Sequence, residues 1–357
     1  MKFIIYGAGV RGKKIIAKWG GLARDEIAGV FDRWKTGEVL GVPISRYEDG
    51  ACDVPVVVSL ARIEAAIEVE SDLRRAGYQK IFWYRENPYD DMLAGQLDDM
   101  STWGDAVLPQ VEMHVSDACN LNCRGCTHFS PLFHQIDAQL EVCLADVRKL
   151  AGKVSHIVDF FLLGGEPFLN PEIGAYIKGI HRILPRTRLN IVTNGLLIPK
   201  LSQDVLDVIR QNEVVVSISE YAPTHEHIDE ITARLEDAGV KYEIRSFDSR
   251  KIFNKPISLV PDEKYPQKCI SDGCVNIYKG KICRCPTLMY AFKFNEVFGT
   301  HLPTDGILTL DEAPEGAALL EWLKTPVPLC AHCVENPIPW SRCEGQPKID
   351  DFAVTNG

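Results

Sequence analysis

Three cysteines lie within one short stretch of this sequence, CNLNCRGC, at Cys119, Cys123 and Cys126. Three thiolates on one loop can bind three corners of a cubane [4Fe-4S] cluster and leave its fourth iron open to another ligand. A structural zinc site is the alternative, but zinc normally takes four protein ligands, and His128 is the nearest candidate for the fourth. The spacing therefore favours an iron-sulfur cluster with one open iron.

A second set of four cysteines lies in the last third of the chain, at Cys269, Cys285, Cys330 and Cys333. The first two are separated by C-x10-G-x4-C, and the last two form C-x2-C after a further 44 residues. Four such ligands could close around a [4Fe-4S] cluster or around a tetrahedral zinc ion. Three nearby cysteines have no assigned partner and are either alternative ligands or buried apolar residues: Cys274, Cys283 and Cys343.

The cysteine triad follows a strand-like segment, VEMHVS, and strand-like and helix-like segments then alternate as far as residue 250. Such alternation predicts parallel strands with crossover helices, closed or partly closed into a barrel. Barrel enzymes place their chemistry at the carboxyl ends of the strands. The residues that follow these predicted strands are Gly164, Gly165 and Glu166 after the second, Asn194 after the third, and Ser217 and Ser219 at the end of the fourth.

The N-terminal segment begins with a short apolar strand, a glycine turn at Gly7, Gly9 and Gly12, and a helix-like stretch. A second strand ends at Asp32, 20 residues after Gly12, where a carboxylate could accept a hydrogen bond from a ribose hydroxyl. The pattern stops near residue 88, about half the length of a complete dinucleotide-binding domain. The N-terminal unit could therefore bind a nucleotide, or it could be a docking module that binds none, and both interpretations stay open.

These patterns together predict an α/β protein of several parts. A small Rossmann-like domain over residues 1–88 is followed by a linker over 89–110, a partial (β/α)6 barrel over 111–250 and a cysteine-rich region over 251–357.

The formal net charge of -10 argues against nucleic acid or an anionic membrane surface as the main partner, and a small neutral or cationic substrate is expected instead. No apolar run approaches the roughly 20 residues that span a bilayer, and no signal-peptide cleavage pattern is visible. We therefore expect a cytoplasmic protein, in which cysteines serve as metal ligands or core residues more often than as disulfides.

The triad and the strand-end motifs together resemble the radical S-adenosylmethionine (SAM) enzymes. This resemblance covers residues 111 to about 250. It implies that the open iron binds the amino and carboxylate groups of SAM. It also implies reductive cleavage of SAM to methionine and a 5'-deoxyadenosyl radical, which abstracts hydrogen from the substrate. An external one-electron reductant such as flavodoxin or ferredoxin is then required.

The same resemblance assigns SAM contacts to the strand ends. Gly164, Gly165 and Glu166 match the family's GGE element, which holds the SAM amino group. The positions that contact the SAM carboxylate and ribose correspond to Asn194, Ser217 and Ser219.

One position departs from the family pattern. The residue before the third cysteine is commonly aromatic in this family and lies against adenine, whereas here it is Gly125. Phe129 or a residue later in the barrel is then expected to hold the adenine.

The second cysteine set resembles the twitch form of the SPASM region, which implies one auxiliary [4Fe-4S] cluster without an open iron. Its spacing is similar to that of 2-deoxy-scyllo-inosamine dehydrogenase, and the N-terminal unit resembles modules of sugar and glycan modification proteins. These resemblances imply a polyol, cyclitol or nucleotide-linked sugar as substrate, with the auxiliary cluster accepting an electron in a dehydrogenation.

Three other functions stay open at this point. They are a redox-neutral sugar epimerase or dehydratase, a peptide-modifying radical SAM enzyme, and a binding protein whose clusters are structural. The catalytic base is not identified, although four residues follow the fourth strand and are candidates: Glu220, Tyr221, His225 and His227.

Overall fold

The structure is a computed structural model that describes residues 2–19, 27–47, 53–86, 97–262, 269 and 273–355. The chain divides into two compact units, Met1–Val107 and Leu108–Gly357. Within the described ranges, no helix has both the length and the apolar character that crossing a membrane requires.

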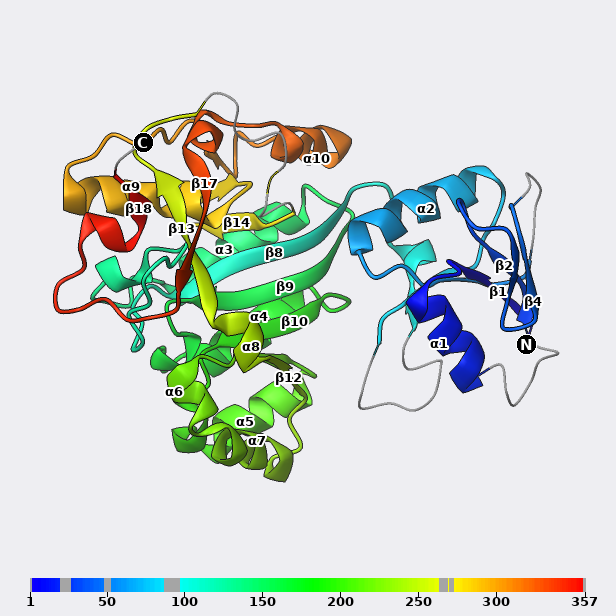
Figure 1. The fold of residues 1–357 in the computed structure, drawn as a ribbon, viewed down its shortest axis with the longest axis horizontal. Coiled ribbons are helices and arrows are strands. Elements are labelled where there is room, and N and C mark those ends of the chain that lie inside the picture. Colours follow the sequence, from blue (N-terminus) through cyan, green and yellow to red (C-terminus); the bar gives the residue numbers. More distant parts are fainter. Residues whose placement is uncertain are drawn as a thin grey trace. The chain divides into compact units, whose positions relative to one another are not determined.

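The first unit is built on a sheet with the strand order β3-β4-β2-β1-β5-β6-β7 (Figure 1). Its inner strands pair in parallel, and β3 and β7 pair antiparallel at the two edges. The strand β1 is buried along its whole length, as expected for a parallel strand covered on both faces. The elements are β1 (Phe3–Tyr6), α1 (Val10–Trp19), β2 (Ile27–Phe31), β3 (Gly37–Val39), β4 (Val42–Ser45), β5 (Val56–Val58), α2 (Ile63–Arg75), β6 (Ile81–Tyr84), β7 (Leu97–Asp99) and the 3₁₀ helix η3 (Met100–Thr102).

Part of the segment that the sequence assigns to a linker belongs to this first unit. Residues 97–99 form β7, which pairs with β6 and so covers an otherwise open sheet edge, and Met100 is fully buried. The sequence pattern does not reveal this strand because it is only three residues long and contains two aspartates. Residues 89–96 of the predicted linker lie outside the described residues.

The second unit contains a sheet of eight described strands in the order β12-β11-β10-β9-β8-β14-β15-β16. Its elements up to residue 250 are β8 (Val107–Ser116), η4 (Ser130–Leu132), α3 (Leu140–Ala151), β9 (His156–Gly164), η5 (Pro167–Leu169), α4 (Ile173–Ile183), β10 (Arg188–Thr193), η6 (Ile198–Lys200), α5 (Gln203–Gln211), β11 (Val215–Ser219), α6 (Ala222–His225), α7 (Ile228–Asp237), β12 (Tyr242–Arg245) and α8 (Phe247–Arg250).

The predicted α/β class with parallel strands is confirmed in this unit. The strands β9, β10, β11 and β12 pair in parallel in chain order, and β8 lies next to β9. A further parallel strand, β14, pairs with β8 on the other side, and it comes from the predicted cysteine-rich region. The sheet thus takes a strand from beyond residue 250, which residue periodicity does not indicate because pairing between distant segments leaves no local pattern.

The remaining elements carry the second cysteine set. They are β13 (Ile252–Ser258), β14 (Val275–Tyr278), β15 (Lys281–Cys283), α9 (Pro286–Phe298), β16 (Leu308–Thr309), α10 (Gly316–Lys324), η7 (Pro328–His332), β17 (Cys333–Pro339), η8 (Ile349–Asp351) and β18 (Ala353–Val354). β13 lies between β17 and β18 in a small sheet, and in Figure 1 β13 and β17 run across the ends of the parallel strands.

The main core fills the space between the parallel strands and their helices. Cys143 is buried in this core with Leu144, Val147 and Leu150 of α3, which confirms that this cysteine serves packing. The apolar stripe of α3 therefore packs the helix against the sheet, and the strand ends that carry the polar motifs rest on an apolar core.

Candidate functional site

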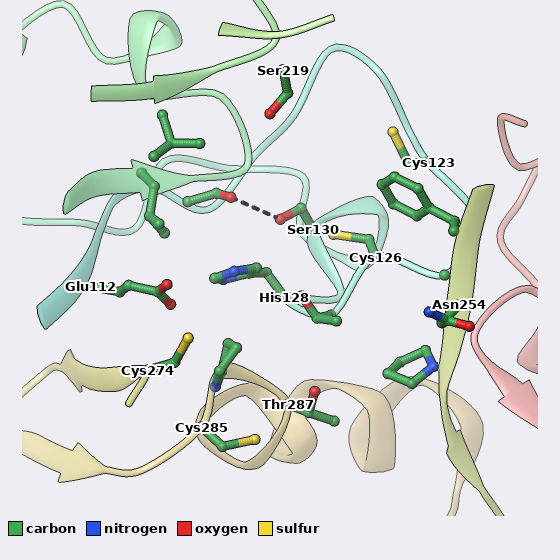
Figure 2. Close-up of a pocket in the computed structure, with 18 of the residues that line it drawn as sticks. Glu112, Cys123, Cys126, His128, Ser130, Ser219, Asn254, Cys274, Cys285 and Thr287 are labelled. Atoms are coloured by element: carbon green, nitrogen blue, oxygen red, sulfur yellow. Dashed lines mark hydrogen bonds between the residues drawn. The ribbon is translucent and has the colours of Figure 1, made fainter. Parts of the chain in front are cut away.

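Both cysteine sets line one cavity of about 540 Å³ in the second unit. The cysteines around it are Cys119, Cys123, Cys126, Cys269, Cys274, Cys285, Cys330 and Cys333. Figure 2 shows Cys123 and Cys126 in the upper part of the view and Cys274 and Cys285 in the lower part. The two motifs, separated by more than 140 residues in the chain, thus meet at one site.

The triad lies on the loop that follows β8, as predicted. Burial raises the pKa of Cys119 to about 12 and raises the pKa values of Cys123 and Cys126 as well. Hydrogen bonds from the peptide N–H groups of residues 128–130 to the sulfur of Cys126 partly offset this rise. Three thiols on one loop, of which that of Cys123 is buried and the other two are half-buried, are a donor set that fits a [4Fe-4S] cluster, whose iron ions would favour the thiolate forms.

The C-terminal segment holds the triad loop in place. The Arg124 backbone N–H donates to the Ser341 carbonyl at 2.9 Å, and the Gly125 N–H donates to the Asp351 carbonyl at 2.8 Å. The side chains of Arg124 and Asp351 also pair, with 2.9 Å between Nε and Oδ1. The loop therefore depends on residues more than 200 positions later, which the sequence motifs do not indicate.

The surroundings of Gly125 explain why this position holds glycine and not the aromatic residue that is common in the family. Its φ is +71°, and a Cβ atom there would lie 2.5 Å from the Asn254 carbonyl oxygen of β13. A side chain at this position would collide with the backbone of β13, since real Cβ atoms do not approach an oxygen so closely. An aromatic residue is thus excluded by the strand that passes in front of the loop.

Gly164 and Gly165 also lie very close to backbone atoms, in this case at the end of β8 and the start of the triad loop. A Cβ atom would lie 1.9 Å from the Ser116 carbonyl oxygen at Gly164 and 2.1 Å from the Ala118 carbonyl oxygen at Gly165. The Gly165 N–H donates to the Ser116 carbonyl at 2.7 Å. Both glycines line the cavity, so the end of β9 reaches the triad loop only because these two side chains are absent.

Glu166 lies behind these glycines and is not among the residues that line the cavity. Its carboxylate accepts hydrogen bonds from Thr193 Oγ1 at 2.7 Å, Asn194 N at 2.9 Å and Phe168 N at 3.1 Å. Burial raises its pKa to about 7, although these donors oppose the rise. In this geometry the carboxylate connects the ends of β9 and β10, and a direct contact with SAM stays a prediction.

The polar residues predicted at the next two strand ends divide into two groups. Asn194 and Ser219 line the cavity. The side chain of Asn194 donates to Asn120 Oδ1 on the triad loop at 2.7 Å. Ser217 is fully buried and donates to Glu243 Oε1 at 2.8 Å, so it does not reach the cavity.

The second cysteine set surrounds the opposite part of the cavity. Cys285 caps α9 and its sulfur accepts the Leu288 N–H at 3.5 Å, while the sulfur of Cys330 accepts the Val327 N–H at 3.4 Å. Burial raises the pKa of Cys285 to about 12 and of Cys333 to about 11, and the charges of Cys269 and Cys333 raise that of Cys285 further. The four predicted ligands are thus electrostatic neighbours, and their donor set fits a closed [4Fe-4S] cluster.

The three unassigned cysteines have different surroundings. Cys274 lines the cavity, and its sulfur lies 3.0 Å from Gln110 Nε2. Cys283 is fully buried and donates to the Cys285 carbonyl at 3.2 Å. Cys343 bonds through its backbone N–H to the Asn122 carbonyl at 2.8 Å. Of the three, Cys274 is the thiol placed at the cavity.

Among the described residues, no three His, Cys, Asp or Glu side chains converge on a position where one metal ion would bind. The cubane assigns each cysteine to a different iron, so its ligands surround the cluster instead of meeting at one point.

The predicted nucleotide residues lie in the first unit, where the glycine turn is stabilised from within. The Asp32 carboxylate accepts hydrogen bonds from the N–H groups of Ala8, Trp34 and Lys35, each at 2.8 Å. Burial opposes ionisation, but these bonds hold the pKa of Asp32 below its usual value. A Cβ atom at Gly12 would lie 1.9 Å from the Gly7 carbonyl oxygen, and one at Gly9 would meet nothing. Gly7 and Gly12 thus serve close packing, and nucleotide binding by these four residues stays a prediction.

The candidate bases after β11 are only partly at the cavity. Tyr221 lines it, whereas Glu220, His225 and His227 do not. Glu220 accepts hydrogen bonds from His225 Nδ1 at 2.7 Å and from Phe247 N at 2.8 Å, which fixes the start of α8. Phe129, an expected adenine contact, is fully buried against Phe294 and Phe352 and serves the core.

Sequence reasoning missed four residues at or beside the cavity. Arg245, Arg250 and Arg284 line it, and the Trp340 indole N–H donates to the sulfur of Cys123 at 3.2 Å. Arg245 is the last residue of β12, and a position at the carboxyl end of a parallel strand could have pointed to it. Arg250 ends the short helix α8, whereas Arg284 and Trp340 directly follow strands, and none of the three belongs to a sequence motif.

Comparison with known proteins agrees with this geometry. Residues 113–244 match the model of the Radical SAM superfamily. The chain is also 30% identical over 97 residues to GTP 3',8-cyclase of Clostridium acetobutylicum, a match that covers 27% of this chain and 30% of that protein. The region that matches this model contains all three cysteines of the triad.

The solved structures that match this chain have low sequence identity to it. One is BtrN in complex with AdoMet and 2-DOIA, with 15% identity and a TM-score of 0.40, which covers 64% of this chain and 94% of that one. Native anSMEcpe with bound AdoMet and Cp18Cys peptide has 17% identity and a TM-score of 0.30, covering 38% and 42%. Streptococcus suis SuiB bound to S-adenosylmethionine has 15% identity and a TM-score of 0.31, covering 44% and 38%. The chain thus spans less than half of the cyclase, anSMEcpe and SuiB chains.

Proposed function

We propose that this protein is a radical SAM oxidoreductase that abstracts hydrogen from a polyol, cyclitol or nucleotide-linked sugar and oxidises an alcohol carbon. The observation that supports it is that the triad and the second cysteine set line one cavity of about 540 Å³. A substrate held there would lie between the two sets, within reach of a radical on one side and of an electron acceptor on the other.

When bound, SAM and its cluster supply the 5'-deoxyadenosyl radical, and the cluster of the second set supplies a one-electron acceptor. The protein positions them. The triad would hold the first cluster, and Cys269, Cys285, Cys330 and Cys333 would hold the second. The backbone of Gly164 and Gly165 and the side chains of Asn194 and Ser219 would orient SAM from the strand ends.

Tyr221 would replace the aromatic residue that Gly125 cannot provide. Its ring lines the cavity and stacks on Trp340, with 5.6 Å between ring centroids and 17° between planes. Trp340 in turn bonds to Cys123, so this aromatic pair adjoins the triad. An adenine held against Tyr221 would lie on a surface already fixed by packing.

A redox-neutral epimerase is the second candidate, and the position of Cys274 favours it. An epimerase returns a hydrogen atom to the substrate carbon, and a thiol is a suitable donor. Cys274 is the cavity thiol that the four predicted cluster ligands leave over, and Figure 2 shows its sulfur beside Glu112. The reaction would be epimerisation if Cys274 donates a hydrogen atom to the substrate radical, and oxidation if the second cluster accepts an electron from it.

The central test is reductive SAM cleavage by the anaerobically reconstituted protein. The wild type should form 5'-deoxyadenosine and methionine, and simultaneous replacement of Cys119, Cys123 and Cys126 by Ala should abolish this. Cys143→Ala is the matched control, because Cys143 is a buried cysteine of the core. Continued cleavage by the triple variant would disprove the proposal.

Metal content tests the second cluster separately. Two [4Fe-4S] clusters correspond to about eight irons per chain, and the triple variant should retain about four. About four irons with stoichiometric zinc in the wild type would contradict the presence of an auxiliary cluster.

The mass of the product then distinguishes the possible reactions when the enzyme is tested on a panel of polyols, cyclitols and nucleotide sugars. Loss of two hydrogens indicates oxidation, and unchanged mass with one deuterium gained in heavy water indicates epimerisation.

A further inference from the structure

Three arginine side chains line the cavity between the two cysteine sets. Arg245 ends β12, Arg250 ends α8, and Arg284 immediately precedes Cys285. Among the described residues that line the cavity, Glu112 is the one carboxylic acid, and burial raises its pKa, which favours its neutral form. The three arginines therefore supply fixed positive charge to the cavity wall, although the whole chain carries a net charge of -10.

Two of these arginines have no hydrogen-bond or ion-pair partner for their side chains within the part of the chain that the structure describes. The buried Nε of Arg250 is unsatisfied there, and Arg245 acts on Glu112 through its charge without a direct ion pair. Arg284 donates one hydrogen bond, from Nη1 to the Lys324 carbonyl at 2.9 Å, which leaves its other donors available. A partly buried guanidinium without an acceptor is costly, so a bound ligand is the natural source of the missing acceptors.

We propose that the cavity binds its substrate through an oxyanion, a phosphate or a carboxylate, held by Arg250 together with Arg245 and Arg284 of the same cavity wall. The planar guanidinium presents paired N–H donors that match both oxyanions, and its charge remains fixed at all relevant pH values. This inference rests on the proposed function, because it names the substrate class of the same site. It replaces the neutral or cationic substrate expected from net charge with an anionic one.

The SAM carboxylate is a competing occupant, and position argues against it. The expected SAM contacts, Gly164, Asn194 and Ser219, lie at the ends of β9, β10 and β11. Arg245 pairs with Ser219 between β11 and β12 and so lies beside these contacts. Arg250, by contrast, lies beyond the end of β12, and Arg284 immediately precedes Cys285 of the second cysteine set. A ligand that contacts Arg250 and Arg284 extends away from the strand ends toward the second set, as a substrate would.

The test is calorimetric titration of the anaerobically reconstituted full-length protein with SAM already saturating, so that the SAM carboxylate site is filled. Inorganic pyrophosphate and malonate are the two oxyanion probes, and they distinguish a phosphate from a carboxylate. The neutral polyol myo-inositol is the control ligand. At least one oxyanion should bind, and Arg250→Gln should weaken it by about tenfold or more, as expected for loss of a charged hydrogen-bonding group.

Arg210→Gln is the matched control variant, because Arg210 lies on α5 and pairs with Asp207 at a partly exposed position. It should bind the probe like the wild type. Arg250→Lys retains charge but not the paired donors, and it should bind with intermediate affinity, which also covers the case in which the Gln variant does not fold. Absence of binding by both oxyanions, or equal binding by wild type and Arg250→Gln, would overturn the inference.

A third contrary result is weakened SAM binding in Arg250→Gln together with unchanged probe binding, which would assign the arginine to SAM. These outcomes are separate from failure of the proposed function, which appears as absent SAM cleavage by the wild-type protein. A wild type that cleaves SAM but binds neither oxyanion overturns only the anionic substrate.

Discussion

The indole N–H of Trp340 donates a hydrogen bond to the sulfur of Cys123 at 3.2 Å. The two residues are 217 positions apart in the chain, and they meet because β17 brings the C-terminal segment across the triad loop. The backbone bridge between Cys123 and Arg342 strengthens the same contact. The C-terminal region thus contributes to the triad site as well as to the second set.

Replacement of Trp340 by Phe should lower the reduction potential of the cluster held by the triad. The aromatic ring that stacks on Tyr221 is retained, but the N–H donor is lost, and hydrogen bonds to ligand sulfurs favour the reduced, more negative cluster. Potentiometric titration followed by electron paramagnetic resonance measures this, with Cys330 and Cys333 replaced by Ala to leave one cluster. Trp322→Phe on α10 is the control, and an unchanged or higher potential in Trp340→Phe would contradict the assignment.

Replacement of Gly125 by Ala should destabilise the second unit more than an ordinary glycine substitution at positive φ. Gly299 also has positive φ, +63°, but an added Cβ there meets nothing within 4 Å. Gly299→Ala should cost only the conformational term of about 1–2 kcal/mol. Gly125→Ala adds the clash with the Asn254 carbonyl, so its Tm should be lower by several degrees, about 2–4 °C for each further kcal/mol. Equal Tm values would show that β13 moves freely away from the loop.

The ionisation of Glu166 should destabilise the ligand-free protein as pH rises. Burial raises the folded-state pKa to about 7, above the ordinary value of 4.5, so the folded state binds more protons than the unfolded state between these values. The free energy of unfolding should therefore fall from about pH 4.5 to pH 7, by on the order of 3 kcal/mol, and this contribution should then level off. Urea unfolding at several pH values checks it. Glu166→Gln should lose this decline, and the exposed Glu141→Gln should keep it.

Replacement of Asp32 by Ala should loosen the glycine turn of the first unit whether or not a nucleotide binds. Three backbone N–H groups lose their acceptor. The part-buried N–H of Ala8 costs about 1–3 kcal/mol if it is left unsatisfied, whereas the exposed N–H groups of Trp34 and Lys35 can bond to water. Hydrogen exchange measured by mass spectrometry should be faster in peptides covering residues 2–19 and 27–47. The exposed Asp53→Ala is the control. Unchanged exchange would mean that the carboxylate is free for a ribose.

The same unit should not transfer hydride. Its sheet has β1 between β2 and β5, but it lacks the length that normally completes a nicotinamide site. Absorbance at the NADH band during SAM-dependent turnover with added NAD should stay constant. Formation of NADH would reverse this view.

The sequence by itself determined the triad, the candidate second set and the parallel α/β architecture around the triad. Cys119, Cys123 and Cys126 are recognisable because ligands on one loop are close in sequence as well as in space. The strand ends at Gly164, Asn194 and Ser219 are recognisable because alternating strands and helices of a parallel sheet leave a local periodicity, and the ends of such strands gather at one edge.

Only the tertiary structure decided which of these residues share the cavity. In the folded chain, Glu166 and Ser217 are buried and do not line the cavity. Cys274 lines the cavity, whereas Cys283 is buried away from it. Arg245, Arg250 and Arg284 line the cavity together with the two cysteine sets. The tertiary structure also excluded a side chain at Gly125, because β13 passes against that loop. These outcomes depend on the pairing of β14 with β8 and of β17 with β13, segments far apart in the chain. Contacts of this kind are set by packing across the whole unit and leave no mark in the spacing of neighbouring residues.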